Sequence, residues 1–119
     1  MALEEHTYTE LSQLVAGNFR ASKQVTLTNP GGSDLELQRG QVLYQDTDYK
    51  FQPLPSDGTE VARAILAEDV TVPAGSDAEA LVYFVGEYRL ADIVWPDGIS
   101  EANKSKAIQE LQDRGIILK

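Results

Sequence analysis

The sequence has 119 residues, no cysteine and a formal net charge of −9 at pH 7. A chain of this length most often forms one domain, and it can bury enough surface to fold without disulfides or metal ions. The absence of cysteine excludes disulfides, thiolate nucleophiles and cysteine-based zinc sites. No apolar run approaches the roughly 18 residues of a membrane span. The first residues, MALEEHTYTE, carry glutamates where a signal peptide would carry positive charge, so we expect a soluble protein made in the cytoplasm.

The negative charge is concentrated in the middle of the chain. Residues 34–97 contain 13 acidic and 4 basic residues. Such a segment argues against sequence-independent binding to nucleic acid, which requires Lys and Arg to replace phosphate counterions. It is either a solvated acidic surface or, alternatively, a mimic of nucleic acid or an acidic face offered to a basic partner.

Residues 1–22 show only weak helical periodicity. Leu11, Leu14 and Val15 could form one helical turn, but Gly17 and Asn18 interrupt the pattern. Ordering about 20 residues costs on the order of 20–40 kcal/mol of backbone entropy, which a few apolar side chains at about 1.5–3 kcal/mol each do not cover. We therefore predict a flexible N-terminal arm, 1–22, which becomes ordered on a partner, and a single domain over 23–119.

The domain reads mainly as strands separated by turns. Turn-forming residues dominate 29–34 and 73–77. The predicted strands are 23–28, 42–44, a short one at 49–51, one continuous strand over 61–72, and the strongest one over AEALVYFVGEYRL at 78–90. Pro53 and Pro55 argue against a central strand position for the segment that contains them. The run LVYFV at 81–85 is apolar on both faces, which predicts a strand in the centre of a sheet.

The clearest helix follows Ser100, which is a suitable N-cap residue. Gly115 stands where a C′ glycine ends a helix, and Ile116 would then contact Leu111. The final residues, IILK, predict a short strand that returns to the core. The fold class is therefore α+β and β-rich, a compact body with one C-terminal helix.

Residues suited to catalysis are few. His6 is the only histidine and lies in the predicted arm, so a Ser-His-Asp triad has no centre. Asp46 and Asp48 have the first spacing of a calcium loop, but the glycine and glutamate that should follow are missing. No glycine-rich phosphate loop is present. We expect no enzyme activity, no cofactor and no metal site.

Trp95 is the only tryptophan, and Pro96 restricts it to extended geometry at a strand–helix junction. A tryptophan there could fill the core, contact another subunit or form a platform for a small molecule. The residues alone leave these three alternatives open.

The C-terminal part of the chain resembles a known family. VYFVGEYRLADIVWPDGISEANKSKAIQELQDRGIILK, at 82–119, is similar to the head decoration proteins of tailed bacteriophages, the family of the lambda decoration protein. The similarity rests on a strand, the Tyr88–Arg89 pair, the run DIVWP at 92–96, a polar helix and a closing glycine-plus-aliphatic strand. The turn DGT at 57–59, followed by Ala64-Ile65-Leu66, also resembles that family. The resemblance covers about 57–119.

The resemblance implies a structural protein of the virion. It implies a homotrimer, synthesised late in the host cytoplasm, which binds threefold sites on the outer surface of the expanded head. There it would cement the major capsid (coat) protein against internal DNA pressure, without nucleic-acid or membrane contact. The arm residues implied in capsid binding are His6, Thr7, Tyr8, Thr9 and Leu11. The residues implied in the trimer or capsid interface are Tyr88, Arg89, Trp95 and Pro96. The alternative function is an acidic monomeric adaptor or nucleic-acid-mimicking module.

Overall fold

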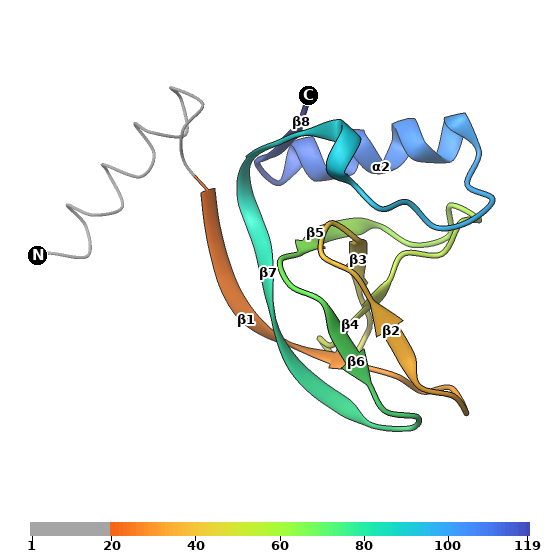
Figure 1. Ribbon diagram of the computed structural model, residues 1–119. Coiled ribbons are helices and arrows are strands. Elements are labelled where there is room, and N and C mark those ends of the chain that lie inside the picture. The colour runs from red at the N-terminus through yellow and green to blue at the C-terminus, as the bar shows by residue number, and fades with distance from the viewer. Residues whose placement is uncertain (1–19) are drawn as a thin grey trace, which may run out of the picture.

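The computed structural model describes residues 20–119 (Figure 1). Its elements in chain order are β1 (Arg20–Thr28), β2 (Leu35–Leu37), β3 (Val42–Gln45), β4 (Phe51–Pro53), β5 (Ala62–Leu66), β6 (Val70–Val72), β7 (Asp77–Tyr88), the 3-10 helix η1 (Leu90–Asp92), α2 (Glu101–Asp113) and β8 (Ile116–Leu118). This strand-rich arrangement with one C-terminal α-helix confirms the predicted fold class.

Five strands close on one another to form a small barrel. The main sheet has the order β1-β4-β3-β5-β7-β8, and β7 also pairs with β1, which joins the two ends of the five-stranded part. The antiparallel β1–β7 pair runs along the whole of β1, from Arg20 opposite Gly86 to Thr28 opposite Asp77, as the long curved ribbons in Figure 1 show. Strand β8 extends the sheet by pairing in parallel with the end of β7.

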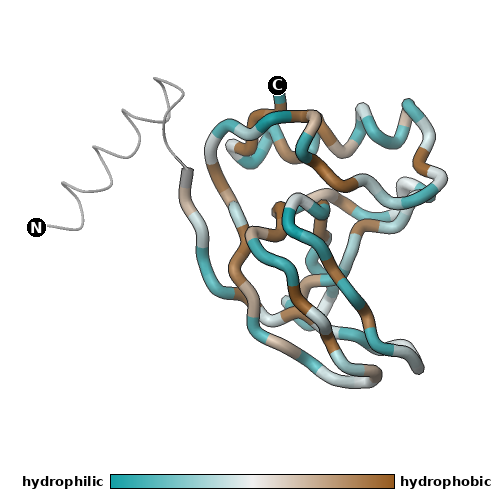
Figure 2. The backbone as a smooth tube through the Cα atoms, in the orientation of Figure 1, coloured by the Kyte–Doolittle hydropathy of each residue, from teal (hydrophilic) through white to brown (hydrophobic). Residues whose placement is uncertain are grey.

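The buried side chains form two clusters, one on each face of the curved sheet. The barrel core contains Leu27, Leu37, Leu43, Phe51, Ala64, Leu66, Val72, Ala80 and Val82. The helix core, which includes buried residues of α2, contains Val42, Leu54, Ala62, Ile65, Tyr88, Ile93, Ala107, Leu111 and Ile116. In Figure 2, apolar segments lie along the strands, whereas α2 alternates between apolar and polar residues. Because neighbouring side chains of a strand point to opposite faces, Ile65 and Leu66 of β5 enter different cores.

Helix α2 begins and ends where the sequence predicts. The hydroxyl of Ser100 accepts a hydrogen bond from the backbone N–H of Asn103 at 3.1 Å, so Ser100 is the N-cap. Gly115 has a positive φ of 94°, which suits a C′ glycine. Leu111 and Ile116 are both buried in the helix core, in agreement with the predicted contact.

The prediction of one strand over 61–72 is wrong. The segment divides into β5 and β6, and β6 pairs with β2 in a separate two-stranded sheet. Two acidic side chains stabilise the turn between them. Glu68 accepts a hydrogen bond from the N–H of Leu81 at 2.7 Å, and Asp69 accepts one from the N–H of Arg39 at 2.8 Å. These contacts are far apart in the sequence, so strand propensity could not reveal them.

The short strand predicted at 49–51 is displaced toward the C-terminus. Tyr49 has a φ of +64° and lies in a turn, and the strand β4 begins at Phe51 and ends with Pro53. The expectation that proline keeps this segment away from a central position is also wrong, because β4 lies between β1 and β3. Pro53 is tolerated because β1 pairs with β4 only at Phe51.

The strand predicted over 78–90, with its apolar run at 81–85, is confirmed as β7, which pairs with β1, β5 and β8. Two of its large apolar side chains are nevertheless accessible, since Leu81 and Phe84 are 43% and 37% exposed. Strand β1 begins at Arg20, three residues before the expected start of the domain. Within residues 20–119, no helix is long and apolar enough to cross a membrane.

Candidate functional site

The segment that follows β7 is held against the turn before β3 by a close backbone approach. The backbone N–H of Val94 donates to the carbonyl oxygen of Gly40 at 2.9 Å. Gly40 has a φ of +97°, and a Cβ atom there would lie 2.4 Å from the carbonyl oxygen of Asp92. Only glycine fits this approach, so Gly40 determines where the segment from Arg89 to Val94 lies.

This approach creates a cleft of about 360 Å³ on the surface. It is lined by Arg39, Gly40, Ile65, Tyr83, Tyr88, Arg89, Asp92 and Ile93. The guanidinium of Arg39 donates a hydrogen bond to the hydroxyl of Tyr83 at 3.0 Å. The rings of Tyr83 and Tyr88 pack with their centroids 4.9 Å apart. The cleft therefore combines two arginines, one carboxylate and a pair of aromatic rings.

Tyr88 and Arg89 are neighbours in the cleft but differ in exposure. Tyr88 is only 8% exposed, and its hydroxyl donates to the carbonyl oxygen of Val85 at 2.6 Å. Arg89 is exposed. The Tyr88 ring thus stabilises the cleft from the interior of the fold, whereas the Arg89 side chain is exposed at the surface.

Trp95 and Pro96 lie further along the same segment and do not line the cleft. Trp95 is half-buried against the helix core. The ammonium of Lys104, on α2, lies 5.7 Å from the centroid of its ring, a distance at which a cation–π interaction is favourable. One side of Trp95 therefore joins this segment to α2.

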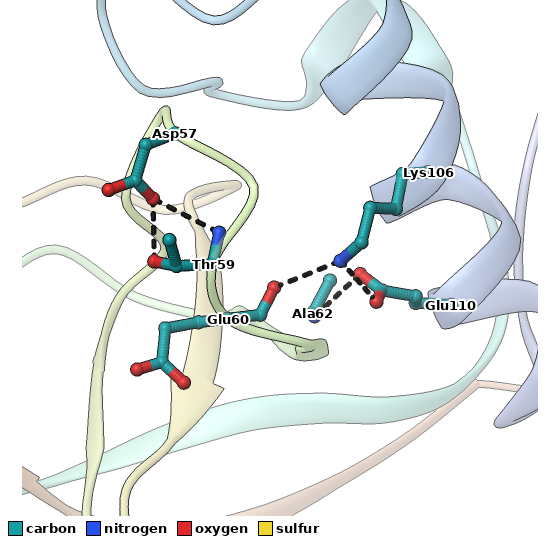
Figure 3. Close-up of polar contacts among 6 residues, drawn as sticks. All are labelled: Asp57, Thr59, Glu60, Ala62, Lys106 and Glu110. Atoms are coloured by element: carbon teal, nitrogen blue, oxygen red, sulfur yellow. Dashed lines mark hydrogen bonds and ion pairs between the residues drawn. The ribbon is translucent and has the colours of Figure 1, made fainter.

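The loop between β4 and β5 is also attached to α2 by polar contacts (Figure 3). Glu110 accepts from the N–H of Ala62 at 3.1 Å and pairs with Lys106 at 2.7 Å. The hydroxyl and the N–H of Thr59 both donate to Asp57, and these bonds hold the pKa of the Asp57 carboxyl below its ordinary value. These bonds shape the turn at 57–59, and the carbonyl oxygen of Glu60, which accepts a hydrogen bond from the Lys106 ammonium at 3.4 Å, joins the loop to α2.

The Asp46 carboxylate stabilises the neighbouring turn. Burial raises the pKa of this group, but hydrogen bonds from the Gln52 amide and from the backbone N–H groups of Lys50 and Asp48 outweigh burial. The pKa of Asp46 consequently lies below its ordinary value. Residues 20–119 contain no group of three or more His, Cys, Asp or Glu side chains that could hold a metal ion.

The structure brings together some of the predicted site residues and adds others. Tyr88 and Arg89 share the cleft with Arg39 and Asp92, which the sequence did not indicate. The signal that could have suggested this pairing is Gly40, because a glycine directly before a strand often marks a close backbone approach. The predicted arm residues His6, Thr7, Tyr8, Thr9 and Leu11 lie outside the described residues.

A comparison with protein families identifies the class to which the chain belongs. The sequence model of the family described as bacteriophage lambda head decoration protein D matches residues 4–116. The match extends well beyond the C-terminal part that carried the resemblance, and includes most of the predicted arm. The chain therefore belongs to this family, whose members are structural proteins that decorate the phage head. A comparison with curated protein sequences gave no match.

Proposed function

We propose that the protein binds the expanded phage head as a trimer at threefold sites and stabilises the shell against internal DNA pressure. The observation that carries this proposal is the family match over residues 4–116, which includes both the predicted arm and the domain. The protein would have no enzyme activity and no cofactor. It would be synthesised late, in the host cytoplasm, and would act on the outer surface of the capsid without contacting nucleic acid.

The proposed attachment divides between the arm and the domain. Residues His6, Thr7, Tyr8, Thr9 and Leu11 would contact the coat protein, and an extended arm can add a strand to a sheet edge through backbone hydrogen bonds alone. A trimer would present three arms together. Three weak contacts then act as one strong attachment, because the second and third bind at high effective concentration.

The segment after β7 is the proposed subunit or capsid contact of the domain. Arg89 and Leu90 are exposed there, and Leu90 is one of the few exposed large apolar side chains among residues 20–119. Trp95 and Pro96 are half-buried and keep part of their surface available. The buried ring of Tyr88 would support this contact from the interior of the fold. Arginine and aromatic residues are enriched at protein interfaces, which agrees with this choice.

Co-sedimentation with empty phage heads, expanded and unexpanded, tests the proposal. We expect saturable binding to expanded heads only, with copies bound in multiples of three per site. A variant lacking residues 1–15 should keep its melting temperature and lose attachment, and the full chain is its matched control. Failure to bind any related head would contradict the proposal and favour the acidic adaptor. Salt-sensitive binding to a basic protein would then be the observation to seek.

A further inference from the structure

A second hollow, of about 190 Å³, differs from the cleft in its charge. Three cationic side chains from separate parts of the fold line it: Lys23 of β1, Arg63 of β5 and Arg114 after α2. The other lining residues are Gln45, Phe51, Ala64 and Phe84. None of these seven residues is acidic, although the protein as a whole carries a net charge of −9. We call this site the basic hollow.

Among the lysines of residues 20–119, Lys23 alone forms no ion pair with a carboxylate, and the two arginines of the basic hollow form none either. Elsewhere in residues 20–119, Lys50, Lys106 and Lys119 form ion pairs with Asp77, Glu110 and Glu87. Within the same residues, no ion pair joins a carboxylate to Lys23, Arg63 or Arg114. Like charges that converge without a counter-charge repel one another, so the arrangement favours an anionic occupant.

The hollow also has an exposed aromatic surface. Ala21 pairs with Val85 and Ser22 with Tyr83, so Phe84 is the extra residue of a β-bulge in β7. Bulges redirect side chains at functional surfaces. Phe84 is 37% exposed, and the ammonium of Lys23 lies 5.3 Å from its ring centroid. An aromatic ring beside three cations suits an acidic peptide that carries an aromatic side chain better than it suits a small inorganic anion.

Such a peptide is present in the chain itself and joins the domain next to the hollow. Residues 1–19 contain Glu4, Glu5 and Glu10 but no Lys or Arg, and Tyr8 stands among the glutamates. They lead directly into β1, whose first residue, Arg20, pairs with Gly86, two residues from Phe84. The ten residue steps from Glu10 to Arg20 can span at most about 33–36 Å. A tethered segment this short has an effective concentration of order mM at a neighbouring site.

We propose that the basic hollow binds residues 4–10 of the same chain in the free protein. The glutamate carboxylates pair with Lys23, Arg63 and Arg114, and Tyr8 packs against Phe84. Because residues 6–9 also belong to the proposed capsid-binding arm, the shell and the hollow compete for them. This competition rests on the proposed function, whereas the docking itself concerns the free protein and does not depend on it.

Zero-length carbodiimide cross-linking of the full-length protein tests the proposal, since it joins only a lysine and a carboxylate in direct contact. Equal amounts of ¹⁴N- and ¹⁵N-labelled protein are mixed, cross-linked and analysed by mass spectrometry. We expect Lys23 to be joined to Glu4, Glu5 or Glu10 within single copies. The double variant Arg63→Gln/Arg114→Gln should lower this yield about threefold or more. The matched control Lys119→Gln removes a cation outside both the hollow and the proposed interface and should leave the yield unchanged.

Three outcomes would overturn the proposal. The absence of any link from Lys23 to these glutamates would show that the segment does not occupy the hollow. Links between differently labelled copies would assign the hollow to the arm of a second copy. A cross-linking yield that stays the same in the double variant would show that the glutamates lie near Lys23 but are not held there by Arg63 and Arg114. If the double variant does not fold, the wild-type protein at 0.5 M NaCl serves in its place, where screening should lower the yield in the same way. Co-sedimentation with heads is scored separately, so the two proposals can fail independently.

Discussion

The barrel core and the helix core are built in different ways, although they lie on two faces of the same strands. The barrel core is closed by strand pairing, and its members come from β-strands alone. The helix core has strands on one side only, and it is completed by α2, β8 and the segment after β7. The barrel core should therefore resist local opening, whereas the helix core depends on the docking of a short C-terminal part.

We expect the largest loss of stability from a substitution in the barrel core. Leu66 is fully buried there, so Leu66→Ala should lower the free energy of unfolding by about 3–5 kcal/mol, because it removes buried methyl groups and leaves a cavity. Urea denaturation measures this change. Leu81→Ala, on the same sheet but 43% exposed, is the control and should cost less than about 1 kcal/mol. Equal losses from both variants would contradict the assignment of Leu66 to a closed core.

A substitution in the helix core shows whether this core can open while the barrel core stays folded. Leu111 of α2 is fully buried in the helix core, and Leu111→Ala should destabilise the protein by about 2–4 kcal/mol. Amide hydrogen exchange should accelerate in α2 and β8 much more than in β1 and β7, since the helix can open while the barrel remains paired. Gln109→Ala, an exposed position of the same helix, is the control. Uniform acceleration throughout the protein would show that both cores unfold as one unit.

Trp95 tests how firmly the segment after β7 is held to the helix core. Because the ring is half-buried, Trp95→Ala should cost about 2 kcal/mol, below the range for a fully buried tryptophan. Trp95→Phe should recover part of this loss. Thermal melting and analytical ultracentrifugation are the measurements. An unchanged melting midpoint together with an unchanged oligomer mass would show that Trp95 is neither a core nor an interface anchor.

The N-cap of α2 should have a smaller effect on the same core. Ser100→Ala removes the acceptor for the Asn103 N–H and should cost about 1 kcal/mol. Ser100→Asp keeps an acceptor and should behave like the wild type. Urea denaturation of the three proteins checks this order. A loss in Ser100→Asp as large as in Ser100→Ala would show that the hydroxyl does not act as a cap.

We expect the smallest change in stability from Asp46, which lies in the turn beside the barrel. Its pKa is lowered in the folded state, so its stabilisation is present above the unfolded pKa of about 3.9 and disappears as the pH falls through the folded value. The wild type should therefore lose more stability between about pH 4 and pH 2 than Asp46→Asn does. Unfolding curves at several pH values test this. An Asp46→Asn variant with the same pH dependence as the wild type would contradict this assignment.

Much of the fold could be predicted because the signals were local. Ser100 and Gly115 mark the ends of α2 through hydrogen bonds and backbone angles within one turn of the helix. The run at 81–85 is apolar and β-branched enough to identify β7. The division of 61–72 into β5 and β6 could not be predicted in this way. It depends on hydrogen bonds that Glu68 and Asp69 accept from backbone N–H groups 13 and 30 positions away.

The same contrast applies to the sites. Composition and motifs alone indicated that the chain is β-rich and pointed to the phage head decoration family. The tertiary structure decided which of the predicted residues face outward: Tyr88 is buried in the fold, while Arg89 next to it is exposed. It also brought Lys23, Arg63 and Arg114 to one hollow. The physical reason is that local patterns encode turns and strands, whereas burial and the convergence of charges depend on contacts between segments distant in the sequence.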